Sequence, residues 1–382
     1  MRTAEKTHGE QSAQQSEQLI STEQKFTFCF AGFDSIFVFE LTVMFFKVMA
    51  RVDAKPVPGS DPTFPRLSHI AYLFQLYIII YAFTHKPRKA FPSELQFKTN
   101  DNTEILHPLP DKLSPSQDNI ELSLVIPCYN ETKRLKIMLD DAITYLKKTY
   151  NNNFEILIVD DGSKDDTSNY ALELATSTFH LKPGQLRVIQ FVKNRGKGGA
   201  VTHGVQFARG SYIIFADADG ASKFSDLDKL MESIKIADSN KPNEIPAVAI
   251  GSRAHMVNTD AVVKRSFIRN FLMYGLHTLV YIFGIRTIKD TQCGFKLFNK
   301  ASVREIFPYM HTEGWIFDVE ILIIAIRKKI EIKEIQISWH EVDGSKMDLA
   351  RDSINMAVDL VVTRMAYLLK IYSDNSNKLK DN

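Results

Sequence analysis

A regular alternation of apolar strands and amphipathic helices between residues 120 and 215 constrains the fold more than any other feature of the chain. The apolar runs have the length and composition of buried strands, and the segments between them repeat apolar residues with helical spacing. Strands that alternate with single helices form a parallel sheet with helices on both faces. The sequence therefore predicts an α/β fold around a mostly parallel sheet. The expected strands are 122–126, 154–159, 186–192 and 211–215, and the expected helices are 132–150, 165–179 and 198–208.

Polar loops follow each of these predicted strands. They are PCYNE at 127–131, DDGS at 160–163, NRGKGG at 194–199 and DADG at 217–220. A single loop of this kind is explained equally well as a turn or as a helix cap. Parallel sheets, however, bind ligands beyond the carboxyl ends of their strands, where all of these loops should meet. We therefore interpret them together as one ligand site.

The loop after the last of these strands has the chemistry of a metal site. Asp217 and Asp219 are two positions apart, so in extended chain their side chains point the same way. Two carboxylates that face one site repel each other, and a divalent cation removes that cost. Carboxylates together with substrate phosphates hold Mg²⁺ or Mn²⁺. The glycines of NRGKGG allow close approach of a phosphate, which Arg195 or Lys197 can meet.

Composition argues against two other classes of protein. The formal net charge is +2, which makes no electrostatic case for a nucleic-acid partner. The chain has 3 cysteines, Cys29, Cys128 and Cys293, and their positions show no metal-type spacing. An odd, sparse count argues against a disulfide framework and suits a reducing compartment.

The region before residue 120 is expected to attach the domain to a membrane. Residues 67–84 carry no Asp, Glu, Lys or Arg. As a helix they would be roughly 27 Å long, close to the ~30 Å hydrocarbon core. The basic run HKPRK follows and places that end in the cytosol. We expect a transmembrane helix at 67–84, with a buried core helix as the alternative, and then a linker at 85–119. The extension 1–66 starts as a polar, disordered stretch, and its Phe-rich part 26–50 is a second span, an interfacial helix or an extension of little consequence.

Two further apolar segments are expected to lie in a membrane interface. Residues 267–285 and 357–372 are apolar but interrupted by charged residues, which suits helices with one face in the lipid. Ordinary amphipathic core helices are the alternative. The expected boundaries are 120–345 for the α/β domain and 346–382 for a C-terminal amphipathic helix and tail.

Longer motifs carry a resemblance to a known family. LSLVIPCYNE, ILIVDDGSKDDT, NRGKGGA and IIFADADGASKF resemble the nucleotide-sugar half of the inverting GT-A glycosyltransferases of family 2, whose fold is Rossmann-like. Further on, AIGSR, IKDTQCGFKLF, GWIFDVEIL and WHEVDGSKM are similar to motifs of the eukaryotic dolichyl-phosphate β-glucosyltransferase family of the endoplasmic reticulum. The resemblance covers about residues 67–372, and the motifs are specific in combination.

The resemblance implies transfer of glucose from UDP-glucose to dolichyl phosphate with inversion. The product, dolichyl β-D-glucosyl phosphate, would serve as glucose donor for N-glycosylation. It also implies an enzyme of the endoplasmic reticulum membrane, in contact with membrane lipid and with its catalytic domain facing the cytosol. Formation of a homo-oligomer stays open. The alternatives are a dolichyl-phosphate mannosyltransferase-like or other polyprenyl-phosphate sugar transferase, and a non-catalytic nucleotide-binding membrane protein.

Roles for single residues follow from the same resemblance. Asp217 and Asp219 form the DxD metal site on the UDP diphosphate. The mannose-transferring relatives place a glutamine two residues after the second aspartate, where this chain has Ala221. That difference supports glucose as the transferred sugar and leaves a third metal ligand unassigned. The residues implied around the donor are Pro127, Tyr129, Glu131, Asp160, Asp161, Lys197, Asp217 and Ala218, with Asp160 supporting its loop.

A phosphate acceptor simplifies the expected mechanism. Its second pKa is about 6, so it arrives largely as a dianion and needs no general base. Catalysis then rests on positioning and electrostatics. We expect arginines at the acceptor, because guanidinium binds phosphate in a bidentate way. Asp318 stands where other family-2 enzymes place a base; here it holds a glucose hydroxyl or the acceptor, or is a carboxylate favoured by a helix N-terminus. The expected acceptor-phosphate residues are Arg253, Arg265, Arg269, Lys346 and Arg351, and the expected catalytic residues are Asp217, Asp219, Arg253 and Asp318.

Overall fold

The computed structural model describes residues 64–101, 105–115, 120–256, 285–342 and 349–374. The predictions for 1–24, for 26–50 and for nearly all of 267–285 fall outside these ranges. The chain divides into two units between Phe83 and Thr84, and each unit is described by itself.

The first unit contributes one described helix, α3 (Phe64–Phe83). It matches the helix expected at 67–84 to within three residues. In the described ranges, no helix combines the length and the apolar character that crossing a membrane requires. The helix is therefore confirmed, and its transmembrane interpretation is not.

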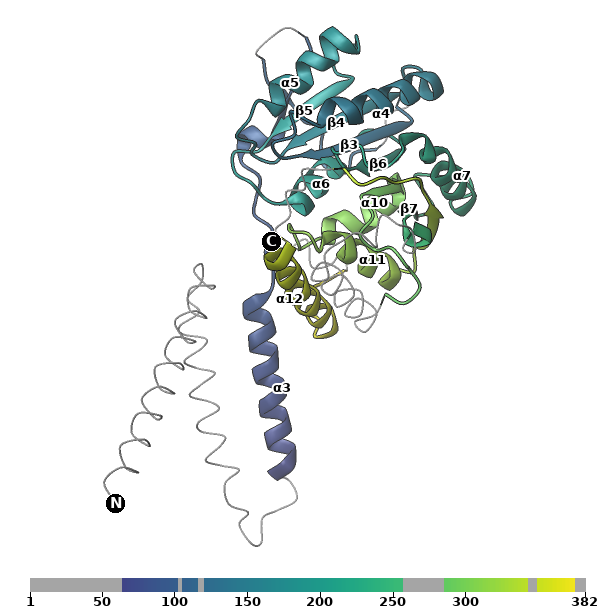
Figure 1. Cartoon of the computed structure of the whole chain (residues 1–382). Helices are drawn as coiled ribbons and strands as arrows, with labels where there is room; N and C mark the ends of the chain where they lie inside the picture. The colour runs from purple at the N-terminus through teal and green to yellow at the C-terminus, as the bar shows by residue number, and fades with distance from the viewer. Residues whose placement is uncertain (1–63, 102–104, 116–119, 257–284, 343–348, 375–382) are drawn as a thin grey trace, which may run out of the picture. The chain divides into compact units, whose positions relative to one another are not determined.

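The second unit is built on one sheet. Its nine described strands lie in the order β2-β1-β5-β4-β3-β6-β8-β7-β9, and Figure 1 labels β3 to β7. They are β1 (Gln96–Thr99), β2 (His107–Pro108), β3 (Leu122–Cys128), β4 (Phe154–Asp160), β5 (Leu186–Gln190), β6 (Tyr212–Ala216), β7 (Ala247–Ser252), β8 (Phe295–Asn299) and β9 (Glu331–Gln336).

The predicted parallel core is confirmed. β3 pairs in parallel with β4 and with β6, so that Val125 lies opposite both Leu157 and Phe215, and β4 pairs in parallel with β5. Every residue of β4 and β6 is buried, which agrees with the uninterrupted apolar runs of a sheet covered on both faces. The antiparallel strand β8 lies between β6 and β7. Ala216 at the end of β6 therefore pairs with Phe295 at the start of β8, which brings β8 to the edge where the polar loops lie.

The segment expected to be a linker is part of this sheet. β1 pairs antiparallel with β5, and β2 pairs antiparallel with β1, so residues 96–99 and 107–108 extend the sheet at one edge. Glu94 anchors the turn before β1, because its buried carboxylate accepts hydrogen bonds from Arg88 and from the backbone of Val192. The prediction of a linker over 85–119 is wrong for these residues. Their order comes from pairing with a distant strand and not from a local pattern.

Helices cover both faces of the sheet (Figure 1). On one face, α4, α5 and α7 close a core with Leu122, Leu124 and Ile126 of β3. On the other, α6 lies so close to β3 that a Cβ on Gly204 would come within 2.6 Å of Val125. The helices are α4 (Leu135–Tyr150), α5 (Thr167–Glu173), α6 (Lys197–Gln206), α7 (Leu227–Ala237), α10 (Lys300–Ile306), α11 (Phe317–Arg327) and α12 (Leu349–Leu368), with a π-turn at Leu174–Thr178 and 3₁₀ turns at Pro92–Leu95, Phe224–Asp226, Ala254–Met256 and Phe307–Tyr309.

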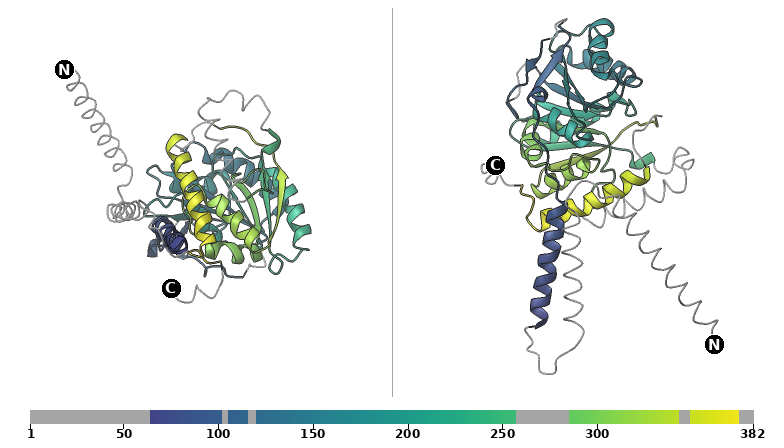
Figure 2. Two further views of the ribbon diagram at one scale, coloured as in Figure 1. Left: turned by 90° about the horizontal axis from the view of Figure 1, so that it is seen from below. Right: turned by 90° about the vertical axis from the view of Figure 1, so that its left-hand side faces the viewer.

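The C-terminal helix α12, yellow in Figure 2, packs against α11, since Tyr367 contacts both Glu320 and Arg327. The Tyr367 hydroxyl of α12 donates to the buried Glu320 of α11 at 3.0 Å. Glu320 also accepts from the hydroxyl of Thr312 at 2.6 Å. The amphipathic helix expected at 357–372 is thus present, although it begins eight residues earlier, at Leu349.

A buried ion cluster joins three strands at the edge opposite the polar loops. Glu155 is fully buried between Arg187 at 2.7 Å and Arg209 at 2.6 Å, and the Ser123 hydroxyl donates to it at 2.6 Å. Burial alone would raise the pKa of Glu155, but the two guanidinium groups lower it. A lowered pKa in the folded state means that the stabilisation is present above the ordinary glutamate pKa and is lost as the pH falls through the lowered one.

We expect Glu155→Gln to lower the free energy of unfolding by about 3–5 kcal/mol, because it leaves two arginines without their counter-ion. Urea unfolding at neutral pH measures this loss. The control is Glu121→Gln, which removes a half-exposed pair with Lys235 and should cost less than ~1 kcal/mol. Equal effects of the two substitutions would contradict the assignment of Glu155 as the hub of this cluster.

Candidate active site

Four polar loops meet at the carboxyl ends of β3, β4, β5 and β6. The backbone N–H of Asn130, after β3, donates to the Ser163 hydroxyl, after β4, at 2.8 Å. The Asp161 carboxylate, after β4, accepts from the backbone of the glycine-rich loop. Lys197 of that loop lies 2.6 Å from Asp217, after β6. The structure therefore brings together the loops that the sequence predicted to meet.

The two aspartates after β4 hold the backbone of this region. Asp160 is fully buried and accepts from the backbone of Ser163 at 2.8 Å and from the Ser168 hydroxyl at 2.5 Å. Asp161 accepts from the backbone N–H groups of Arg195 at 2.6 Å and Gly196 at 2.9 Å. Burial raises the pKa of Asp161 to about 6, while these N–H donors work against the rise. Near neutral pH its carboxylate is therefore mostly ionised.

Gly196 permits the turn of the glycine-rich loop. Its φ is +88°, and a Cβ there would come within 2.5 Å of the Glu313 carbonyl oxygen. The two basic residues of the loop then point to different partners. Arg195 pairs with Glu313 and lies 5.3 Å from the centre of the Phe191 ring, so its guanidinium serves the scaffold. Lys197, which starts α6, faces Asp217, so of the two it is the candidate for a phosphate.

Asp217 and Asp219 occupy the turn after β6. Asp217 is held by Lys197, and its own backbone N–H donates to the Gly294 carbonyl at 3.2 Å. Asp219 accepts from the backbone of Ala221 at 3.0 Å. Burial alone would lower the pKa of Lys197, but the charges of Asp217 first and then of Asp318 and Asp219 raise it. One ammonium group thus lies within the field of both DxD carboxylates.

A divalent cation fits this pair of carboxylates. Their donors are hard oxygens, which suit Mg²⁺ or Mn²⁺. Among the described residues, no group of three or more His, Cys, Asp or Glu side chains could hold a metal together. Ala221, which stands at the glutamine position of the mannose-transferring relatives, is buried and offers no ligand. The remaining ligands would thus come from phosphate oxygens or water, as is usual for Mg²⁺.

Asp318 lies in the first turn of α11 and is almost fully buried. The ammonium of Lys296, on β8, donates to it at 2.5 Å. Burial raises the pKa of Asp318, and the charges of Lys296 and Lys197 oppose that rise. Asp318 therefore lies at a helix N-terminus, as expected from the sequence. Its carboxylate also pairs with the buried Lys296, which was not expected from the sequence.

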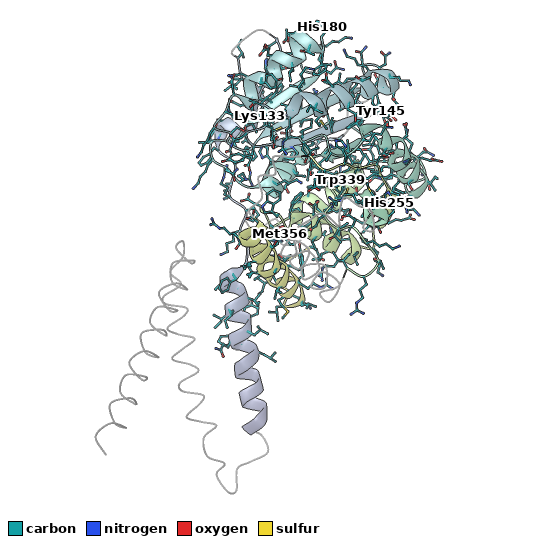
Figure 3. The ribbon with its side chains drawn as sticks, in the orientation of Figure 1. Lys133, Tyr145, His180, His255, Trp339 and Met356 are labelled. Carbon is teal, nitrogen blue, oxygen red and sulfur yellow. The ribbon has the colours of Figure 1, made fainter. Side chains whose placement is uncertain are left out.

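Arg253 follows β7 and is held by Asp290. Its Nε and Nη2 donate to the two carboxylate oxygens at 2.8 Å and 3.0 Å, and its backbone N–H donates at 2.8 Å. Burial would lower the pKa of Arg253, but Asp290 raises it. The indole of Trp339, labelled in Figure 3, lies 5.5 Å from the guanidinium. Backbone bonds from Lys223 to Ser338 and from His340 to Ala221 tie this segment to the DxD turn.

Of the remaining predicted residues, some lie at the site, one lies on α12, and three are outside the described ranges. Pro127 and Tyr129 are half-buried where β3 ends, and Ala218 is buried in the DxD turn. Glu131 is buried and paired with Arg134 at 2.5 Å. Arg351 is exposed near the start of α12. Arg265, Arg269 and Lys346 lie outside the described residues.

Three residues beside the site were missed by sequence reasoning. Asp290, Gly294 and Lys296 belong to IKDTQCGFKLF, which supported the resemblance but suggested no individual roles. A Cβ on Gly294 would fall 2.1 Å from the Asp217 carboxylate, so only glycine leaves Asp217 its position. The clue available in the sequence was that IKDTQCGFKLF places polar residues among apolar ones, which is typical of a site.

Comparisons with known proteins agree with this site. Residues 123–307 match the family model Glycosyl transferase family 2. The chain is 60% identical over 313 residues to the dolichyl-phosphate beta-glucosyltransferase of Saccharomyces cerevisiae, covering 80% of this chain and 93% of that protein. It is 46% identical to the enzyme of the same name from Dictyostelium discoideum (68% and 78% covered) and 44% identical to that from Homo sapiens (65% and 76% covered).

A solved structure is similar at a lower level. It is glucosyl-3-phosphoglycerate synthase from Mycobacterium tuberculosis in complex with Mn²⁺, UDP-glucose and phosphoglyceric acid. The TM-score is 0.45 and the identity 15%, over 64% of this chain and 80% of that chain. This likeness is too weak to bear on function.

We expect Gly294→Ala to lower the rate of sugar transfer by about 10²-fold, the effect of a displacement of roughly 1 Å in an active site. The added methyl group would collide with Asp217 and move it. Steady-state kinetics and the melting temperature measure activity and folding separately. The control is Gly314→Ala, where the nearest atom to a new Cβ is 3.8 Å away. Unchanged kinetics of Gly294→Ala would contradict the fixed position assigned to Asp217.

Proposed function

The chain belongs to the dolichyl-phosphate beta-glucosyltransferases of glycosyltransferase family 2, and we propose that it transfers glucose from UDP-glucose to dolichyl phosphate with inversion. The products are dolichyl β-D-glucosyl phosphate and UDP. The observation that carries the proposal is 60% identity over nearly the whole yeast enzyme of that name. The assembled loops support it, because Asp161 accepts from the backbone of Gly196, and the next residue, Lys197, contacts Asp217 at 2.6 Å.

The donor would bind across the ends of β3, β4 and β6. Asp161 orders the glycine-rich loop by accepting two of its backbone N–H groups. The half-buried Tyr129 would contact the uridine. Asp217 and Asp219 would hold Mg²⁺ or Mn²⁺, which supplies positive charge against the diphosphate when bound. Lys197 adds a fixed positive charge beside them, so charge that develops on the departing UDP is stabilised without a proton transfer.

The acceptor phosphate would be oriented by Arg253. Asp290 engages only two of the side-chain donors of Arg253, and guanidinium carries five N–H donors in all. The remaining N–H donors can bind phosphate oxygens, while Asp290 fixes the plane of the Arg253 guanidinium. Because the acceptor is largely a dianion at neutral pH, it attacks the sugar without a general base. The inversion follows from a single displacement with acceptor and UDP on opposite sides of the anomeric carbon.

We also propose that the enzyme lies on the endoplasmic reticulum membrane, with the catalytic domain in the cytosol. The basic run after α3 supports that orientation. Large apolar side chains are exposed on α3, among them Leu73, Phe74, Tyr77, Ile78 and Tyr81. On α12, Ile354, Val358 and Leu368 are exposed at positions that share one face of a helix. Such a stripe suits a helix with its apolar face in lipid.

We expect the purified enzyme to release UDP from UDP-glucose only with dolichyl phosphate and Mg²⁺ or Mn²⁺ present, and to use GDP-mannose at least about 10²-fold less well. Asp217→Asn should abolish transfer, because it removes charge from the metal site. The control is Asp140→Asn, which changes an exposed carboxylate paired with Lys136. Preferred use of GDP-mannose would overturn the donor assignment, and near-normal turnover of Asp217→Asn would overturn the metal assignment.

We expect Val358→Asp with Leu368→Asp to lower kcat/KM about tenfold for dolichyl phosphate in vesicles, because charges on a lipid face oppose its insertion. With a short, water-soluble polyprenyl phosphate as acceptor, the double variant should have the same kcat/KM as the unchanged enzyme. The control is Asn355→Asp, which adds a charge at another exposed position of α12. Equal loss on both acceptors, or loss on neither, would contradict the interface role of α12.

A further inference from the structure

Lys296 is a fully buried lysine to which the mechanism above gives no role. It lies on β8, and its side chain has no solvent-exposed surface. The ammonium donates to Asp318 at 2.5 Å and to the Cys293 carbonyl at 2.7 Å, and it lies 5.4 Å from the centre of the Phe215 ring. Burying an ion costs several kcal/mol, and apolar residues in place of a buried ion pair are often neutral or stabilising. Stability alone therefore does not explain this pair.

The pair continues into the donor site through Lys197. Asp318 follows Phe317, whose ring centre lies 6.0 Å from the Lys197 ammonium, and Lys197 in turn contacts Asp217 at 2.6 Å. The four groups alternate in sign along the order Lys296, Asp318, Lys197 and Asp217. The rings of Trp315 and Phe317 lie 5.8 Å and 6.0 Å from the Lys197 ammonium, and the lysine side chain is only 18% exposed. In such surroundings each charge depends on its neighbour for its position.

We propose that Lys296 is a positioning residue for glucose transfer, which holds Asp318 so that Asp318 keeps the ammonium of Lys197 beside the donor diphosphate. This inference rests on the proposed function. Asp318 then acts on Lys197 through its charge and not as a proton acceptor, since its carboxylate already accepts a hydrogen bond from Lys296. The anionic acceptor makes a proton acceptor unnecessary. This role also explains why the position common to bases in related enzymes is occupied here by an ion-paired carboxylate.

The balance of formal charge supports this arrangement. The two lysines leave the three carboxylates Asp217, Asp219 and Asp318 with one net negative charge. A divalent cation and the donor diphosphate, which carry opposite charges of equal size, leave that balance unchanged. Loss of Lys296 would raise the net negative charge of the site from one to two. The departing UDP gains negative charge at the same place. Lys296 therefore favours the transition state over the ground state, and its loss should affect kcat more than KM.

The test compares Lys296→Met with Lys300→Met in the full-length enzyme. Lys300 is equally buried and donates to the Ala208 carbonyl at 2.6 Å, away from the four groups. We expect Lys296→Met to lower kcat at least about tenfold while KM for UDP-glucose changes less than about threefold. Lys300→Met should keep kcat within about twofold once corrected for the folded fraction. Wild-type kcat in Lys296→Met, or equal losses in the two variants, would overturn the proposal.

A double-mutant cycle keeps the test decisive if Lys296→Met folds poorly. Asp318→Asn combined with Lys296→Met removes both charges, which avoids a buried unpaired ion. If Lys296 acts through Asp318, the double variant should have the kcat of Asp318→Asn alone within about twofold. A further loss would show an independent role for Lys296 and overturn the proposal. Failure of the unchanged enzyme to transfer glucose would instead refute the proposed function, so the two failures are distinguishable.

Discussion

The parallel pairing of β3 with β4 and β6 is the interaction on which the rest of the structure depends. Because these strands run in the same direction, their polar loops leave the sheet at one edge, and Asp161 and Asp217 reach one site. The antiparallel pairing of β8 with β6 has the complementary effect. β8 enters the sheet at the edge that the parallel strands leave, and it carries Gly294 and Lys296 to the same site. Most of the site follows from these two pairings.

Electrostatic pairing then decides which side chains remain available to a ligand. Arg195 is used by Glu313 and Arg253 is steadied by Asp290, whereas Lys197 stands beside the DxD carboxylates. The segment 311–320 connects these groups to the C-terminal helix, since it also carries Thr312 and Glu320, which bonds Tyr367 of α12. The helix proposed to face lipid and the loop proposed to bind donor phosphate are therefore joined by one short stretch of chain.

The sequence predicted the elements with a strong local pattern and missed those without one. The four expected strands agree with β3, β4, β5 and β6 to within two residues at each end, because buried parallel strands are long apolar runs. β1 has no such pattern, and its strand conformation comes from pairing with β5. Asp217 could be recognised from its spacing to Asp219. Lys296 could not, because a lysine among apolar residues becomes informative only when its partner is known.

The sequence by itself determined the family, the order of strands and helices between residues 120 and 216, and the polar loops that end those strands. All of these depend on residues close together in the chain, where spacing alone limits the conformation. Only the tertiary structure decided the pairings of Lys296 with Asp318 and of Arg253 with Asp290. These partners are 22 and 37 residues apart. The direction of a charged side chain depends on which opposite charge packing brings near it, and nothing local specifies that partner.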